Sequence, residues 1–414
     1  MNNLPFKRKF INDPVYGLIT IPNTLVFDLI EHPWFQRLRR ILQLGLTHYV
    51  YPSAVHTRYQ HALGAMHLMT QAIEVLRSKG ILITAEEEEG ALCAILLHDI
   101  GHGPYSHALE QTMVRELSHE DISLLMMDSL NEQMNNRLET ANRIFRNDHP
   151  KKFLHQLVSS QLDMDRLDYL SRDSFFTGVA EGVINTDRII KMLTVVDDQL
   201  VVEGKGIYSI EKFIISRRLM YWQVYLHKTV IAAEYMLVNI LKRAKELASQ
   251  GVSLFGSPVL HLFLYSDITI THFLEDREWI GEFAKLDDYD ILSAIKVWTT
   301  NPDPILSFLC KSMIDRHLYK VEIQNEPFDR KYIADLKEKT VTLFGLEDEK
   351  DTGYFVVEGT VTNNAYNPEH DRIRIWFRNN ELVDVSEASD QLNISVLSTP
   401  VNKHLLCYSK NIVV

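Results

Sequence analysis

The chain has 414 residues, of which 46% are hydrophobic and 24% are charged, and its formal net charge at pH 7 is −12. This composition is ordinary for a soluble globular protein, and the length suits two or three lobes. No apolar stretch approaches the ~20 residues that cross a bilayer, and the negative charge argues against a broad nucleic-acid-binding surface. We therefore expect neither a membrane nor a nucleic acid as a partner.

The three cysteines, Cys93, Cys310 and Cys407, lie far apart in the sequence. This spacing does not suit a disulfide framework and fits a reducing compartment. No apolar segment follows the basic residues near the N-terminus, so we expect no secretory signal. The sequence therefore predicts a cytoplasmic protein.

Helical patterns dominate the first 320 residues. Apolar side chains recur at close to 3.6-residue intervals over residues 56–79. Four glutamates, Glu86–Glu89, precede the apolar run Ala91–Leu97, and acidic residues also follow Ser118. Acidic residues are favoured where a helix begins, so we expect helices to start at both places.

Residues 162–173 carry a second informative pattern. If this segment is helical, Asp165, Tyr169 and Asp173 lie at i, i+4 and i+8 and share one face. Two carboxylates and a phenol in a row suit a polyhydroxyl ligand that bears phosphate. An exposed acidic helix with salt bridges would give the same pattern.

The pattern changes toward the C-terminus. A short hairpin is predicted at 193–202, and a long aromatic-rich helical stretch at 207–250. Beyond residue 320, alternating strand-like segments occur at 354–361 and 373–377. The predicted fold class is therefore mainly α, with a helical core in residues 1–320 and a small α/β lobe in residues 321–414.

The strongest chemical signal is the segment 98–107, which reads His-Asp-Ile-Gly-His-Gly-Pro-Tyr-Ser-His directly after a buried-type apolar helix. Burying His98 beside Asp99 is costly unless a metal ion or a partner charge compensates. Imidazole with carboxylate suits Mn, Fe, Mg, Zn or Ni. A second His-Asp pair, His370-Asp371, lies in a polar turn and is interpreted as surface.

These segments resemble the ordered motifs of the HD-domain phosphohydrolases. The likeness rests on Arg58–His61, on 98–107 and on Asp165–Asp173. More narrowly, the chain is similar to the deoxynucleoside triphosphate (dNTP) triphosphohydrolases, from Lys9–Pro14 and Phe35–Arg39 onward. The resemblance implies a helical HD core, whose first 45 or so residues form a regulatory segment.

The resemblance also implies roles for individual residues. One divalent metal ion would be held by His61, His98, Asp99 and Asp165, and a second Mg could bind with the nucleotide. The reacting phosphates would be lined by His102, His107, Glu110 and His119. The substrate would be bound by Gln43, Leu44, Arg58, Arg166, Tyr169, Asp173, Arg217 and Tyr225.

The reaction implied is hydrolysis of a dNTP to a deoxynucleoside and tripolyphosphate. His107, oriented by Glu110 and His119, would give a proton to the departing 5′ oxygen. Arginines would offset the phosphate charge. Leu44 packed near the 2′ carbon would leave a ribose hydroxyl without a partner, which favours deoxyribose.

Nucleotide effector sites between subunits are a further implication of the resemblance. They would be formed by Lys9, Asn12, Glu31, Gln36, Arg39, His227 and Lys228, with GTP or a dNTP as effector. Relatives of this kind form homodimers that often pair into homotetramers. Alternatively, Gln36, Arg37 and Arg39 only tie one helix to its neighbours.

Three other functions stay open. The same four metal ligands serve HD enzymes that act on monophosphates, cyclic dinucleotides or alarmones. A non-catalytic nucleotide sensor would have a damaged metal shell, whereas all four positions are filled here. A zinc hydrolase using His98 and His102 ranks last, because Gly101 and Gly103 interrupt a regular helix.

Overall fold

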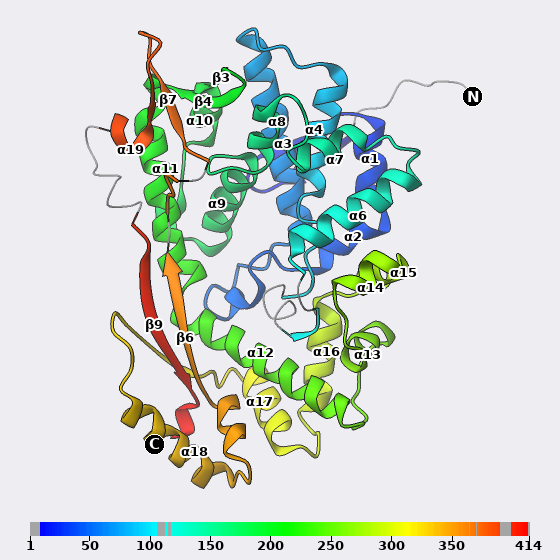
Figure 1. Cartoon of the computed structure of the whole chain (residues 1–414), viewed down its shortest axis with the longest axis vertical. Coiled ribbons are helices and arrows are strands. Elements are labelled where there is room, and N and C mark those ends of the chain that lie inside the picture. The colour runs from blue at the N-terminus through cyan, green and yellow to red at the C-terminus, as the bar shows by residue number, and fades with distance from the viewer. Residues whose placement is uncertain are drawn as a thin grey trace.

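The computed structural model describes residues 9–105, 112–114, 117–363, 365–369, 371–389 and 399–412. The fold is mainly helical, as predicted, with small sheets (Figure 1). The helices are α1 Thr24–Glu31, α2 Pro33–Gln36, α3 Arg58–Ser78, α4 Ala85–Leu97, α6 His119–Gln133, α7 Glu139–Phe145, α8 Lys152–Val158, α9 Met164–Thr177, α10 Thr186–Met192, α11 Ile207–Met220, α12 Lys228–Ser249, α13 Pro258–Tyr265, α14 Ile270–Glu275, α15 Glu278–Phe283, α16 Asp288–Trp298, α17 Pro304–Ile314, α18 Arg330–Phe344 and α19 Val385–Ala388.

The strands form three sheets, ordered β1-β2, β3-β4-β7-β8 and β5-β9-β6. They are β1 Lys9–Asp13, β2 Gly17–Ile21, β3 Leu193–Val196, β4 Gln199–Glu203, β5 Lys320–Gln324, β6 Val356–Asn363, β7 Arg374–Trp376, β8 Leu382–Asp384 and β9 Val401–Tyr408. The predicted hairpin at 193–202 is confirmed as the antiparallel pair β3–β4. Its turn residues Asp197 and Asp198 both have positive φ, at 50° and 61°.

Local sequence signals explain where the helices of the core begin. Thr84 caps α4 and Ser118 caps α6, each through a capping box with an acidic residue at the third helical position. The acidic residues after both caps therefore begin helices, as the sequence predicts. In α4, residues Gly90–Leu97 are all buried, so this helix runs through the interior and ends where the His98-Asp99 pair begins.

Helix α3 packs against both α4 and α9, so residues of these three helices can meet in one site. The predicted helix over 56–79 matches α3, and the segment 162–173 lies mostly in α9. The aromatic stretch 207–250 is not one continuous helix. Instead, α11 ends in a single π-helical turn, Tyr221–Tyr225, and α12 begins after His227.

The C-terminal segment returns to the helical core. Strand β7 pairs in parallel with β4, so residues beyond 320 extend a sheet that begins at residue 193. Strands β6 and β9 run beside α11 and one end of α12 in Figure 1. The boundary near residue 320 stays a prediction. Among the described residues, no helix is long and apolar enough to cross a membrane.

Candidate active site

Four side chains from three helical regions converge at the centre of the HD-type core. His61 lies in the first turns of α3, His98 and Asp99 follow α4, and Asp165 lies in the first turn of α9. His61 Nε2 lies 3.2 Å from His98 Nε2 and 3.1 Å from Asp165 Oδ1. Asp99 Oδ1 lies 3.4 Å from His98 Nε2. The donor atoms of residues far apart along the chain therefore meet at one point.

This geometry fits a divalent metal ion. Ligand atoms held at about 2.0–2.2 Å from one ion lie about 3–3.5 Å from each other. The measured separations of His61, His98 and Asp165 fall close to this range. His61, His98 and Asp99 each offer one ligand atom within 4.8 Å of the others. Two imidazoles and two carboxylates are an ordinary donor set for a divalent transition metal.

The turn after α4 is shaped by close packing. At Gly101 an added Cβ would lie 2.3 Å from the backbone nitrogen of Ser123 and 2.4 Å from the carbonyl oxygen of His119. Only glycine lets the start of α6 approach this closely. The hydroxyl of Ser123 donates to the His98 carbonyl at 2.8 Å and accepts from the Gly101 N–H at 2.9 Å. The turn that carries His98 and Asp99 is therefore fixed from α6.

The electrostatics around Asp99 favour its charged form. Burial opposes ionisation, but His98, His102 and Arg58 hold the pKa of Asp99 well below its usual range. Arg58 Nη1 donates to Asp99 Oδ2 at 2.5 Å. Burial, with the nearby Arg58, holds the pKa of His102 well below its usual value, so this imidazole is neutral near pH 7. His102 stacks on His119, with ring centroids 3.9 Å apart.

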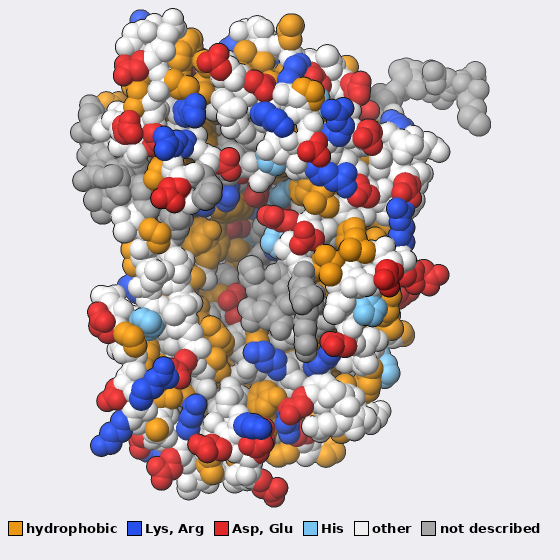
Figure 2. Space-filling model, in the orientation of Figure 1, with side chains coloured by type: hydrophobic (Ala, Val, Ile, Leu, Met, Phe, Trp, Pro, Cys, Tyr) orange, Lys and Arg blue, Asp and Glu red, His pale blue; other side chains and the backbone are white. Residues whose placement is uncertain are grey.

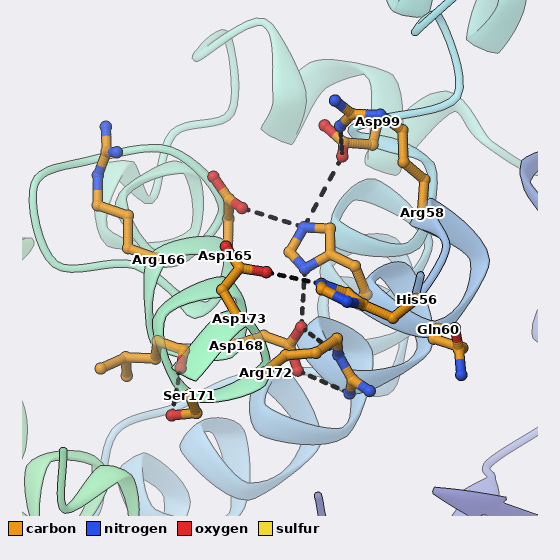
Figure 3. A network of polar contacts seen from close by, with 12 residues as sticks. His56, Arg58, Gln60, Asp99, Asp165, Arg166, Asp168, Ser171, Arg172 and Asp173 are labelled. Carbon is orange, nitrogen blue, oxygen red and sulfur yellow. Dashed lines mark hydrogen bonds and ion pairs between the residues drawn. The ribbon is translucent and has the colours of Figure 1, made fainter. Parts of the chain in front are cut away.

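The sequence analysis missed the carboxylate that orients His61. Asp168, fully buried on α9, accepts from His61 Nδ1 at 2.7 Å, which directs the other ring nitrogen to the metal position. Figure 3 shows Asp99, Asp165 and Asp168 around one imidazole. Burial opposes a charge on His61, whereas Asp165 and Asp168 raise its pKa to about 10. The i, i+4 spacing of Asp168 and Arg172 was a sequence signal for an ion pair, but not for its burial.

A second cluster lies along α9, on the face predicted for a ligand. Tyr225 donates its hydroxyl to Asp173 Oδ2 at 2.7 Å, and His56 Nε2 lies 2.7 Å from Asp173 Oδ1. The rings of Tyr169 and Tyr225 meet edge to face at 6.2 Å. His56 is buried, and its imidazole holds the Asp173 carboxylate in place. The structure therefore brings together Tyr169, Asp173 and Tyr225.

Buried polar atoms without a hydrogen-bond partner mark the same region. Within the described part of the chain, they include Gln43 Oε1, Arg58 Nε and Arg217 Nε. Leaving such atoms unsatisfied is costly, so they point to a polar ligand or water that completes their hydrogen bonds. In the space-filling view, histidine and acidic side chains surround a hollow near the middle of the face (Figure 2).

Comparisons with known proteins agree with this geometry. The HD-domain profile matches residues 58–173, and the profile of an HD associated region matches residues 184–254. A solved phosphohydrolase from Bacteroides thetaiotaomicron is 54% identical, with a TM-score of 0.94 over 98% of this chain and 100% of that chain. The chain belongs to the HD-domain phosphohydrolases. It is therefore similar to a solved phosphohydrolase both in sequence and in fold.

Relatives of this HD phosphohydrolase include proteins with and without a named activity. The uncharacterized protein YwfO of Bacillus subtilis is 34% identical over 321 residues, which cover 76% of this chain and 72% of that protein. The deoxynucleoside triphosphate triphosphohydrolase SAMHD1 homolog of Dictyostelium discoideum is 29% identical over 334 residues. That match covers 75% of this chain and 59% of the homolog.

The remaining residues predicted for the substrate lie near these clusters or on the same helices. Arg166, in the first turn of α9, donates from Nε to the Ser160 carbonyl at 2.6 Å. Leu44 precedes a short helical turn at Gly45–Tyr49. Arg217 is buried near the end of α11, with its guanidinium 6.0 Å from the ring of Tyr221. The phosphate-binding role of Arg217 stays a prediction.

Two predicted catalytic residues, His107 and Glu110, lie outside the described residues of this HD phosphohydrolase. Of the other two, His102 lies with its Nε2 3.2 Å from Asp99 Oδ1, and His119 stacks on His102. The proton donor expected from the sequence therefore stays a prediction. The geometry establishes only that His102 lies next to Asp99 and that His119 stacks on His102.

The residues predicted to bind an effector fall into two groups. Lys9, Asn12, Glu31, Gln36 and Arg39 lie on β1, at the end of α1 and around α2. Within this group Arg39 Nε donates to Gln36 Oε1 at 2.8 Å. His227 and Lys228 stand at the start of α12, which lies well below α1 along the long axis in Figure 1. In one chain, the two groups therefore do not form one site.

Arg37 ties neighbouring segments together, which agrees with the alternative given for Gln36, Arg37 and Arg39. It is fully buried and donates to the carbonyls of Leu286 at 2.9 Å and Ile100 at 3.2 Å, and also to that of His102. It therefore joins the turn that carries His98 and Asp99 to the start of α16. Its position just before Arg39 and Arg40 in the sequence gave no sign that, of these three arginines, Arg37 alone is buried.

Proposed function

We propose that this HD phosphohydrolase hydrolyses dNTPs to a deoxynucleoside and tripolyphosphate. The observation that carries the proposal is the convergence of His61, His98, Asp99 and Asp165 beside Arg58, whose Nε has no hydrogen-bond partner among the described residues. The named activity of the Dictyostelium relative supports the same reaction. A divalent ion held by these four residues would supply Lewis-acid activation of a phosphate oxygen and of water.

The residues of the chain would divide the remaining work. Arg58, Arg166 and Arg217 would bind the triphosphate, because guanidinium groups match phosphate oxygens in charge and geometry. Asp173 and Tyr225, which are joined by a 2.7 Å hydrogen bond, would bind the 3′ hydroxyl of the sugar. The 5′ oxygen needs a proton as it leaves, and His107 would donate it.

Sugar selection would depend on Leu44 and Gln43. An apolar Leu44 side chain near C2′ offers no hydrogen bond to a ribose hydroxyl, so a ribonucleotide would lose a bond that it makes in water. Gln43 is held by its backbone N–H, which donates to the His56 carbonyl at 3.0 Å. The unsatisfied Gln43 Oε1 is available to a donor on the substrate.

Product identification tests the proposal. The Mn²⁺-loaded protein is incubated with dGTP, dATP, dCTP and dTTP separately, and products are resolved by ion exchange. We expect deoxynucleoside with tripolyphosphate and much slower turnover of GTP. Monophosphate with pyrophosphate, orthophosphate alone, or equal rates for GTP and dGTP would contradict this reaction or its sugar selection. An Asp165→Asn variant controls for contaminating phosphatases.

Nucleotide activation and assembly into homodimers or homotetramers are separate proposals. They are supported by the resemblance at Lys9, Asn12, Glu31, Gln36 and Arg39. Because His227 and Lys228 are remote from this group in one chain, a shared effector site would need a second subunit. Hydrolysis of dTTP with and without GTP, together with the mass of the assembly, tests both. No stimulation by any nucleotide would remove the effector proposal.

A further inference from the structure

A chain of buried ion pairs runs from the metal-site histidine to the N-terminal hairpin. His61 Nδ1 donates to Asp168 Oδ2 at 2.7 Å. Arg172 donates to both oxygens of Asp168, from Nε at 2.9 Å and from Nη2 at 3.0 Å. The third nitrogen of the same guanidinium, Nη1, donates to Asp13 Oδ2 at 2.7 Å. Figure 3 shows Asp168 and Arg172 side by side.

The burial of this chain makes its members depend on one another. The side chains of Asp168 and Arg172 are 0% exposed, and that of Asp13 is 4% exposed. Removing one partner of a buried ion pair leaves the other charge uncompensated, which is strongly unfavourable. All three guanidinium nitrogens of Arg172 take part in these hydrogen bonds. A displacement of Asp13 is therefore transmitted to Asp168.

Asp13 belongs equally to the hairpin formed by β1 and β2. Its Oδ1 accepts from the backbone N–H groups of Val15 at 2.9 Å and Tyr16 at 3.0 Å, which closes the turn between the strands. The Tyr16 ring lies 5.6 Å from the Arg172 guanidinium. One carboxylate thus uses one oxygen to shape the hairpin and the other to hold Arg172.

We propose that Asp13 and Arg172 are positioning residues for the metal ligand His61, so that metal binding and the order of the β1–β2 hairpin are thermodynamically linked. Asp168, Arg172 and Asp13 together carry one net negative charge next to His61. This charge favours a cation at the opposite ring nitrogen and opposes its loss. The inference rests on the proposed metal role of His61 and not on the identity of the substrate.

The first test compares Mn²⁺ binding by Asp13→Asn and Asp303→Asn variants of the full chain. The Asp13→Asn change would keep the turn-closing oxygen but replace the acceptor of the Arg172 ion pair by a donor. Asp303 is a matched control, because it likewise caps the backbone N–H of Leu306 and pairs with Arg243, away from His61. Loss of an outer partner of a metal ligand typically weakens metal binding ~10–100-fold. Asp13 lies two contacts beyond the outer partner Asp168, so we expect a smaller weakening of ~3–10-fold.

The result expected is weaker Mn²⁺ binding by Asp13→Asn and wild-type binding by Asp303→Asn, whatever either change does to the unfolding temperature. Equal Mn²⁺ affinity in the Asp13→Asn variant and the wild type would overturn the proposal. So would equal weakening in both variants, which would indicate a general loss of stability. Nucleotide is absent from this titration, so a protein that binds Mn²⁺ but hydrolyses no dNTP refutes the proposed function and not this linkage.

The second test measures the effect of Mn²⁺ on the order of the hairpin. Because coupling between two sites is reciprocal, Mn²⁺ must slow hydrogen exchange of hairpin amides if the hairpin strengthens Mn²⁺ binding. We expect slower exchange in residues 9–21 of the wild type on addition of Mn²⁺. The Asp13→Asn variant, measured at saturating Mn²⁺, should show little of this slowing. Exchange in the wild-type hairpin that is unchanged by saturating Mn²⁺ would overturn the proposal.

Discussion

Replacing Gly64 by alanine should destabilise the protein, although the same change stabilises most helices. Gly64 lies within α3, where an added Cβ would stand 2.0 Å from Asp168 Oδ1 and 2.2 Å from Arg172 Nη2. Real Cβ atoms do not approach other atoms this closely, so the ion pair that orients His61 would have to move. The packing of α3 at Gly64 and the orientation of His61 therefore depend on the same ion pair.

The magnitude follows from two opposing effects. Alanine is favoured over glycine within a helix by about 1 kcal/mol. Breaking a buried ion pair costs about 3–5 kcal/mol. We therefore expect Gly64→Ala to lower the free energy of unfolding by roughly 2–4 kcal/mol. Since His61 loses its oriented partner, Mn²⁺ binding should weaken as well.

Urea unfolding of the metal-free protein measures this change, with Gly281→Ala as the matched control. Gly281 lies within helix α15, and nothing lies within 4 Å of its added Cβ. The control should therefore be as stable as the wild type or slightly more stable, by up to about 1 kcal/mol. A Gly64→Ala protein that is as stable as the Gly281→Ala protein would refute the packing argument at His61.

Two further predictions concern the substrate cluster and a buried carboxyl group. Tyr225→Phe removes the hydrogen bond to Asp173. A hydrogen bond to a charged group contributes about 1.5 kcal/mol, so its loss should lower kcat/KM for dGTP about tenfold. Unchanged steady-state kinetics would exclude Tyr225 from sugar binding. Burial raises the pKa of Asp288 to about 7 from its ordinary value of 3.8, although backbone N–H groups, including that of Leu42, oppose the shift. Because the folded protein holds this proton more tightly than the unfolded chain, Asp288 lowers stability as the pH rises from about 4 to about 7. The unfolding temperature of Asp288→Asn relative to that of the wild type should therefore be higher at pH 8 than at pH 5. The same difference in unfolding temperature at both pH values would contradict this assignment.

The sequence predicted those parts of the site that depend on local pattern. The apolar run before His98 predicted a buried helix, and the i, i+4 and i+8 spacing on α9 predicted the shared face of Tyr169 and Asp173. Helix caps such as Ser118 are equally local, because the capping hydrogen bond spans three residues.

The missed residues depend on contacts between distant segments. Asp168 and Arg172 were visible as an i, i+4 pair, but the pattern does not distinguish an exposed salt bridge from a buried one that reaches His61 and Asp13. A tying role for Arg37 could be stated from the sequence, but its partners, the carbonyls of Leu286 and Ile100, could not. The return of β7 to β4 is a pairing over more than 170 residues, which strand propensity alone cannot indicate.

The metal site itself is tested most directly by counting Mn²⁺ ions bound per chain in the wild type and in an Asp165→Ala variant. The metal-free proteins are titrated with Mn²⁺, and free Mn²⁺ is followed by its electron paramagnetic resonance signal. If His61, His98, Asp99 and Asp165 share one ion, the wild type binds one tight Mn²⁺ and Asp165→Ala loses it or binds it at least tenfold more weakly. A wild type without a tight ion, or an Asp165→Ala variant with unchanged affinity, would contradict the four-residue site.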